Sequence, residues 1–84
     1  MALAIKYIPH ALERMRERGI RRELIEEAIE SPDSVTEGYL GRKVAQKRLN
    51  GKVIRVIYEE EDEDVVVVTA YVTSKVRKYG GVNK

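Results

Sequence analysis

Residues 42–59 have the sequence RKVAQKRLNGKVIRVIYE, and this stretch decides the fold. Two runs that alternate between polar and apolar residues, 42–49 and 52–59, flank the dipeptide Asn50-Gly51. Asn-Gly is the strongest short signal for a two-residue hairpin turn, because both central residues of that turn favour positive φ. The stretch therefore predicts an antiparallel β-hairpin centred on Asn50-Gly51.

The residues that follow the hairpin supply a further strand. The acidic run 59–64 is predicted to form the next turn, and residues 65–72 return as a strand. Four consecutive valines, 65–68, show no alternation, which is typical of a strand that is apolar on both faces and central in its sheet. A weaker strand or loop is predicted at 35–39, and an edge strand within 1–7.

Residues 8–33 have a helical period instead. Pro9 suits the first position of a helix and Gly19 suits a left-handed cap at its end. A second apolar stripe begins at Ile20 and stops at Ser31-Pro32-Asp33. The predicted fold class is α+β, with two N-terminal helices packed on a three- to four-stranded antiparallel sheet.

Length and composition limit the class of protein. The chain has 84 residues, of which 43% are hydrophobic and 36% charged, so we expect one domain over 1–84 with a modest core and a frayed tail at 80–84. The sequence holds no apolar run of the roughly 20 residues that span a bilayer. It also has no cysteine, which excludes disulfides and thiolate metal sites. We expect a cytoplasmic protein with no membrane contact, no cofactor and no metal.

Charge is distributed unevenly along the chain. Residues 59–64 are all acidic, so removing these six charges from the net charge of +2 leaves +8 on the rest of the chain. A basic body with one acidic turn is the layout expected of an anion-binding protein that keeps its acidic tip away from the ligand.

His10, Arg14 and Arg18 recur at intervals of four and therefore share one face of the first predicted helix. Guanidinium groups in a row repel one another, and their fork geometry suits a phosphate. The alternative is that these arginines form ordinary surface ion pairs, Arg14 with Glu17 and Arg18 with Glu13 or Glu26.

The hairpin adds a second group of cations. Alternation is expected to bring Lys43, Lys47 and Arg55 onto one face or near it. Arg55 lies in an otherwise apolar strand, so it must reach water or an anion, which implies a polar hollow on the sheet; the alternative is an arginine that reaches solvent at a sheet edge. Thr69 and Tyr71 share a face of the last strand and could complete the hollow, although core packing explains Tyr71 almost as well.

Several motifs resemble a known family. The chain contains H-A-x-x-R-M-x-x-R-G-I at 10–20, E-x-I-E-x-A-I-x-x-P-D at 23–33, V-V-T-A-Y at 67–71 and S-K at 74–75. This pattern, which covers about residues 10–79, resembles a large family of small prokaryotic domains of unknown function that are similar to the RelE and BrnT ribonuclease toxins. Such families usually have Ser or Thr before H-A, whereas this chain has Ile8-Pro9.

The resemblance implies a single RelE-like domain and an endoribonuclease activity, with Arg77 and Tyr79 acting on the scissile phosphate. RNA cleavage without a metal needs a base, an acid and cations over the phosphorane. Histidine exchanges protons near neutral pH, so His10 is the natural acid or base; the alternative is that it caps or packs the helix. The expected catalytic residues are His10, Lys47, Arg55 and Thr69, and the expected nucleic-acid-binding residues are Arg14, Arg18, Lys43 and Arg77.

The favoured function is a metal-independent endoribonuclease toxin of a toxin–antitoxin system, or an inactive relative of one. Its partners would be RNA and an acidic antitoxin protein. Two alternatives stay open. One is a non-catalytic nucleic-acid-binding domain, and the other is a protein-interaction module, including a homodimer joined through an edge strand such as 35–39.

Overall fold

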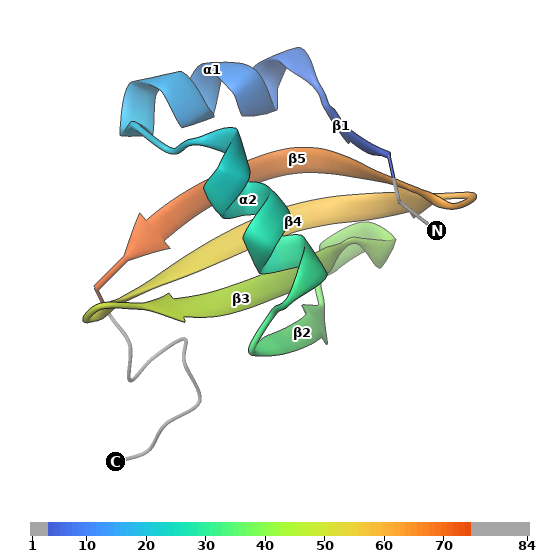
Figure 1. Cartoon of the computed structure of the whole chain (residues 1–84). Coiled ribbons are helices and arrows are strands. Elements are labelled where there is room, and N and C mark those ends of the chain that lie inside the picture. The colour runs from blue at the N-terminus through green and yellow to red at the C-terminus, as the bar shows by residue number, and fades with distance from the viewer. Residues whose placement is uncertain (1–3, 75–84) are drawn as a thin grey trace.

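The structure is a computed structural model that describes residues 4–74 and has the predicted α+β fold (Figure 1). The sheet has the strand order β1-β5-β4-β3-β2. The elements are, in chain order, β1 (Ile5–Tyr7), α1 (Pro9–Arg18), α2 (Arg22–Glu30), β2 (Ser34–Glu37), the 3-10 turn η1 (Tyr39–Gly41), β3 (Lys43–Leu49), β4 (Lys52–Glu61) and β5 (Asp64–Thr73). Within residues 4–74, no helix has both the length and the apolar character needed to cross a bilayer.

The predicted sheet needs two corrections. It has five strands instead of three or four, and it is mixed, because β1 pairs with β5 in parallel while all other neighbours are antiparallel. β1 has only three residues and pairs only with 65–67, since Ile5 lies opposite Val65 and Tyr7 opposite Val67. β5 is therefore central over 65–67, whereas its second half has β4 on one side only.

The central hairpin forms where it was predicted. Leu49 and Lys52 are the last pair before the turn, so β3 and β4 are joined by two residues. Only Gly51 of those two has positive φ, at 70°. The φ angle of Asn50 is not positive, so the expectation of two positive φ angles is wrong. The turn still closes at the predicted place, with glycine in its second position.

The acidic run is mostly strand rather than turn. Residues 59–61 extend β4, Asp64 begins β5, and only residues 62 and 63 form the turn between them. Three cations lie against these acids, with nitrogen-to-oxygen distances of 3.2 Å for Lys6–Asp64, 3.1 Å for Lys43–Glu60 and 2.8 Å for Arg42–Glu59. The acidic tip is thus partly neutralised within the chain.

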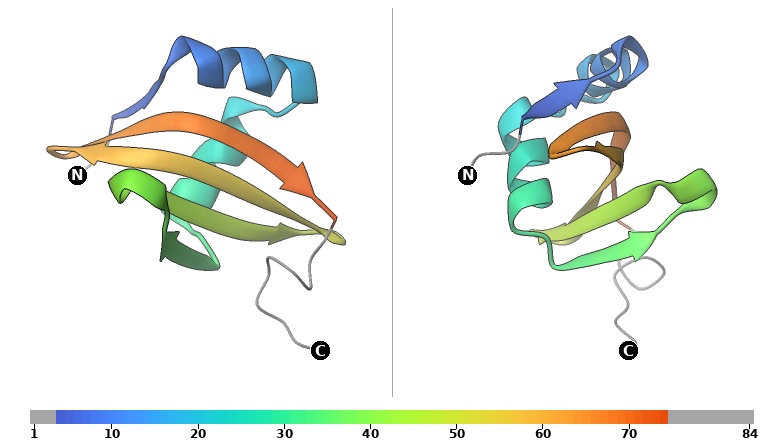
Figure 2. Two further views of the ribbon diagram at one scale, coloured as in Figure 1. Left: turned by 180° about the vertical axis from the view of Figure 1, so that it is seen from behind. Right: turned by 90° about the vertical axis from the view of Figure 1, so that its right-hand side faces the viewer.

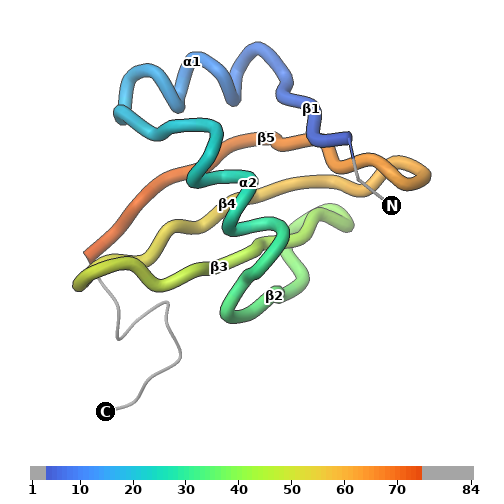
Figure 3. Tube along the Cα trace, viewed as in Figure 1, coloured from blue at the N-terminus to red at the C-terminus, as the bar shows by residue number. Residues whose placement is uncertain are grey.

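Both helices cover the same face of the sheet, and no helix among residues 4–74 lies on the opposite face (Figure 2). Pro9 begins α1, and Gly19 ends it in the left-handed conformation at φ 68°. The tube in Figure 3 shows α1 following the line of β5, while α2 crosses β4 and β3. The core lies between these layers and includes Ala11, Met15, Ile25 and Ala28 from the helices and Ile54, Val56, Val67 and Ala70 from the sheet.

Candidate nucleic-acid interface

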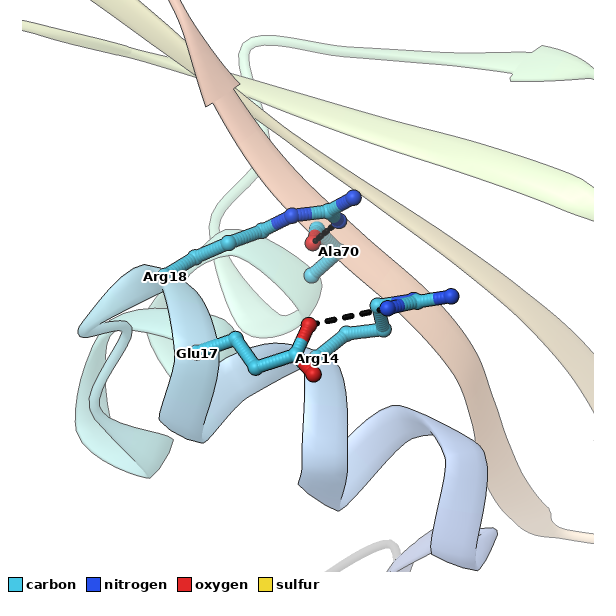
Figure 4. Close-up of polar contacts among 4 residues, drawn as sticks. All are labelled: Arg14, Glu17, Arg18 and Ala70. Atoms are coloured by element: carbon cyan, nitrogen blue, oxygen red, sulfur yellow. Dashed lines mark hydrogen bonds and ion pairs between the residues drawn. The ribbon is translucent and has the colours of Figure 1, made fainter.

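Arg14 and Arg18 of α1 lie along the outer side of β5 (Figure 4). Arg18 donates a hydrogen bond from Nη1 to the carbonyl oxygen of Ala70 at 2.8 Å (Figure 4). Among the described residues, the half of β5 that contains Ala70 has no second strand neighbour. Arg18 therefore donates its hydrogen bond to a carbonyl at the edge of the sheet. Arg14 extends beside it and donates from Nη1 to Oε1 of Glu17 at 2.8 Å.

His10 is exposed and lies one turn before Arg14 on α1. The three residues span eight positions, so their Cα atoms cover about 12 Å along the helix at 1.5 Å per residue. The ion pair between Arg14 and Glu17 was one of the open alternatives for this stripe, and the structure has it. Arg18 takes neither of the glutamates suggested for it and bonds to the backbone of β5 instead.

Arg55 lies on the open face of the sheet, the face without helices. It pairs across β4 and β3 with Gln46, and across β4 and β5 with Tyr71. Arg55 Nη1 donates to Oε1 of Gln46 at 2.8 Å, and its Cζ lies 5.8 Å from the centre of the Tyr71 ring. Gln46 in turn donates from Nε2 to Oγ of Ser34 at 3.3 Å. The result is a row of polar groups across four strands.

Arg18 and Arg55 each contact β5, Arg18 at the Ala70 carbonyl and Arg55 at the Tyr71 ring. Thr69 and Tyr71 alternate with Ala70, so their side chains project from the open face while the Ala70 side chain is in the core. As expected from sequence, Thr69 and Tyr71 share a face, and this face also carries Arg55. We name this set the polar strip, and its members are Arg14, Arg18, Gln46, Arg55, Thr69 and Tyr71.

Lys43 and Lys47 are not on the face of Arg55, and that part of the prediction is wrong. Lys47 lies opposite Ile54, whose side chain is in the core beneath the helices, and Lys43 lies opposite Tyr58 on the same helical side. The reason is the hairpin register. A two-residue turn places odd-numbered residues of β3 opposite even-numbered residues of β4, so Arg55 shares its face with Gln46 and neither lysine.

Both lysines have structural partners on the helical side. Lys47 Nζ donates to the carbonyl oxygen of Ser31, just past the end of α2, at 3.0 Å, and lies 3.9 Å from Oε2 of Glu27. A cation at this position compensates the negative end of the helix. The hydrogen bond with Glu60 raises the pKa of Lys43 above its ordinary value. Lys47 therefore links β3 to the end of α2, and Lys43 links β3 to β4.

A second cluster of titratable groups lies on the helical side, at β1. Arg22 is positioned over the ring of Tyr7, with 5.3 Å between its Cζ and the ring centre. Burial of the ring, followed by the carboxylate of Glu26, raises the pKa of Tyr7 to about 12. The Tyr7 hydroxyl therefore stays protonated at physiological pH and takes no part in proton exchange there.

Gln46 is the member of the polar strip that sequence reasoning did not single out. It is 7% exposed and is the buried polar residue of the described chain, held by Arg55 and Ser34. The hairpin register could have revealed it, because the same two-residue turn places Gln46 opposite Arg55.

Three further expectations concern the residues after 74, the polar hollow around Arg55 and metal binding. Arg77 and Tyr79 lie outside the described residues. Over residues 4–74 no pocket is found, and Arg55 itself is half-buried beside Gln46 and Tyr71. The same residues contain no group of three or more His, Cys, Asp or Glu side chains that could hold a metal ion.

Comparison with known proteins gives one result. The family profile described as "Domain of unknown function (DUF4258)" matches residues 7–72, which include every described member of the polar strip. No curated protein matches the chain. No solved structure matches it either.

Proposed function

The chain belongs to the DUF4258 family, and from its own residues we propose that it is an RNA-binding domain that cleaves RNA without a metal. The proposal takes RNA as the ligand of the polar strip and His10 as the acid or base. The setting of a toxin neutralised by an acidic antitoxin protein rests on the likeness of its motifs to the RelE and BrnT toxins.

The hydrogen bond from Arg18 to the Ala70 carbonyl carries this proposal. It ties the cationic side of α1 to β5 between Thr69 and Tyr71, which belong to the same face as Arg55. Guanidinium groups from a helix and from a sheet strand thereby border one stretch of β5. Such an arrangement suits a phosphodiester chain, which needs several cations at short intervals instead of one deep pocket.

The chemistry of the proposed reaction is transesterification within the RNA. A base takes the proton from a ribose 2′-hydroxyl, the oxygen attacks the adjacent phosphorus, and the 5′-oxygen leaves with a proton, which produces a 2′,3′-cyclic phosphate and a 5′-hydroxyl. His10 takes one of the two proton transfers. Arg14, Arg18 and Arg55 stabilise the charge on the phosphorane, and Thr69 donates a hydrogen bond. Lys43 and Lys47 have no part, because they lie on the helical side.

The test is cleavage of a 5′-labelled single-stranded RNA in the presence of a chelator. We expect fragments that end in a 2′,3′-cyclic phosphate. His10→Ala should lower the cleavage rate by about 100-fold or more, the range of a lost acid or base, with little change in RNA affinity. Cleavage at the original rate in His10→Ala would remove this residue from the proposal.

Lys47→Gln and Arg14→Gln form a matched pair of cation removals. Arg14 belongs to the polar strip, so its loss should weaken RNA binding and lower the slope of log affinity against log salt by about 0.7, the value for one phosphate contact on a single strand. Lys47 lies on the helical side, so its removal should leave both quantities unchanged. Equal effects of the two substitutions would show that RNA follows net charge and not the polar strip.

The second candidate function is RNA binding without cleavage. It is favoured by the hydrogen bonds that two arginines of the strip already make, Arg14 to Glu17 and Arg18 to Ala70. These bonds hold both guanidinium groups in fixed positions on the surface. In the same assay it predicts salt-sensitive binding of the intact chain and no product, with His10→Ala indistinguishable from the original protein.

A further inference from the structure

β2 forms the outer edge of the sheet at the end opposite β1. All four of its residues, Ser34–Glu37, are exposed. The strand contains no lysine or proline, which are the residues that usually prevent an edge strand from pairing with another chain. Within residues 4–74, β2 thus presents an edge that is open to a further strand.

The hydrogen bond at the end of β2 shows which backbone groups face outward. Gly38 N donates to Arg42 O at 2.6 Å, and this pair continues the register of β2 and β3. Hydrogen-bonded pairs alternate along an antiparallel ladder, so Ser34 and Thr36 direct their backbone groups toward β3. Val35 and Glu37 therefore direct their N–H and C=O groups away from the sheet.

Large apolar side chains are exposed beside this edge. Tyr39 and Leu40, in the turn between β2 and β3, are 83% and 73% exposed, and Val35 is 45% exposed. Leu40 also has the left-handed backbone conformation, with φ 61° and ψ 37°. That conformation is unfavourable for leucine. A strained and exposed leucine at the end of an open strand indicates a surface that is covered in an assembly.

We propose that two copies of this chain pair through β2, antiparallel and centred on Thr36. Because only Val35 and Glu37 face outward, the register must place each of them opposite an outward-facing residue of the other copy. Centring on Val35 would place Asp33 opposite Glu37, and centring on Glu37 would place two glutamates together. Both arrangements bring like charges into direct opposition, which destabilises a strand pair.

The register centred on Thr36 is self-complementary, as a two-fold interface requires. It places the two Thr36 residues opposite each other, a favourable cross-strand pair. Val35 then lies opposite Glu37 of the second copy. β2 therefore pairs with itself without a charge conflict, which favours a second copy over an unrelated partner strand.

This interface is independent of the proposed function. β2 and β1 are at opposite ends of the strand order, and α1 follows β5 next to β1. Pairing through β2 joins the sheets of the two copies edge to edge, and each copy keeps its own polar strip.

Cross-linking of the full chain tests the interface and its register together. The sequence has no cysteine, so Thr36→Cys carries one thiol. Opposed residues of a pair that is not hydrogen-bonded have Cα atoms about 4.5 Å apart, which lies within the range of a disulfide. We expect Thr36→Cys to form a disulfide-linked dimer under mild oxidation, faster than Val35→Cys or Glu37→Cys. Leu12→Cys, on α1, is the control and should cross-link slowest. Equal rates for all four variants would overturn the proposal.

Sedimentation velocity over a dilution series tests association without a cross-link. We expect the original chain to sediment as a dimer that dissociates on dilution. Val35→Pro removes one outward N–H and should raise the dissociation constant by about tenfold or more. Leu40→Gly should also raise it, while relieving the strain at φ 61° so that the melting temperature of the dilute monomer does not fall. A chain that stays monomeric at every concentration would overturn the proposal, whatever its activity on RNA.

Discussion

The two outer edges of the sheet differ in whether their backbone N–H and C=O groups are covered. Where β1 ends, α1 runs along the outer edge of β5, and Arg18 donates a hydrogen bond to the Ala70 carbonyl oxygen. β2, at the other end of the strand order, has four exposed residues and, among the described residues, a strand neighbour on one side only. We call the edge along β1 and β5, which α1 and Arg18 block, the covered side. We call the edge along β2 the open side; both names refer to edges of the sheet and not to its faces.

This difference separates two kinds of recognition. A cation at a sheet edge prevents strand addition and at the same time offers positive charge to an anion. An edge without such a cation offers N–H and C=O groups, which recognise another strand through backbone hydrogen bonds. The proposed function assigns RNA to the covered side, and the proposed dimer assigns a second copy to the open side.

Removing the packing beneath α1 should have the largest effect on stability. Met15 is buried between α1 and the sheet. Met15→Ala should lower the free energy of unfolding by about 2–4 kcal/mol, the range for truncating a buried large apolar side chain. Urea unfolding measures the change. Leu12→Ala is the matched control, because Leu12 is 39% exposed on the same helix and should cost less than about 1 kcal/mol. Similar losses for the two variants would show that α1 is not anchored through Met15.

Removing the cation from the covered side should have the next largest effect. Arg18→Met keeps much of the side-chain length and loses the hydrogen bond to Ala70, so it should lower the free energy of unfolding by about 1–2 kcal/mol. Hydrogen exchange should become faster in the second half of β5. Arg14→Met breaks only an exposed ion pair and should cost less than about 0.5 kcal/mol. Unchanged exchange in β5 after loss of Arg18 would contradict its role at this edge.

The sequence predicted those parts of the fold that depend on local signals. Asn50-Gly51 located the hairpin, and Pro9 and Gly19 marked the ends of α1. The parallel pairing of β1 with β5 was missed because it joins residues about sixty positions apart through only three residues, and no local pattern distinguishes a parallel neighbour from an antiparallel one.

The candidate site was predicted in part for a similar reason. The stripe on α1 and the shared face of Thr69 and Tyr71 follow from helical and strand periods within one element. The partner of Arg18 is a carbonyl 52 residues away, which no spacing along the sequence can indicate. The position of Lys47 could have been predicted, because the two-residue turn alone fixes which residues of β3 lie opposite Arg55.

High pH should weaken the covered side through Tyr7 of β1. Its pKa is about 12 in the folded chain and 10.0 ordinarily, because burial and Glu26 disfavour the phenolate. The stabilising contribution is therefore complete below pH 10 and is lost as pH rises toward 12, since the unfolded chain releases its proton first. The full pKa difference is worth about 2.7 kcal/mol, and partial exposure reduces the expected loss to about 1 kcal/mol.

Urea unfolding of the original chain and of Tyr7→Phe between pH 9 and about 12 measures this contribution. The phenylalanine variant keeps the ring and cannot ionise, so the difference in free energy between the two proteins should change across this range by the amount lost. Tyr58 also has a raised pKa, from burial and Glu60, but it is present in both proteins and cancels. Parallel stability curves for the two proteins would contradict the assignment to Tyr7.

Apart from the control substitutions, the smallest effect should come from Lys47, which links the end of α2 to β3 next to the start of β2. Its hydrogen bond to the Ser31 carbonyl compensates the negative end of a short helix, so Lys47→Met should lower the free energy of unfolding by about 0.5 kcal/mol. High salt should reduce the difference between the two proteins, because screening weakens an interaction of this kind. Lys47→Arg keeps the charge and should retain most of the stability. A loss as large as that of Arg18→Met would mean that the open side depends on a side-chain cation as strongly as the covered side does, and the contrast between the two would then lie in exposure alone.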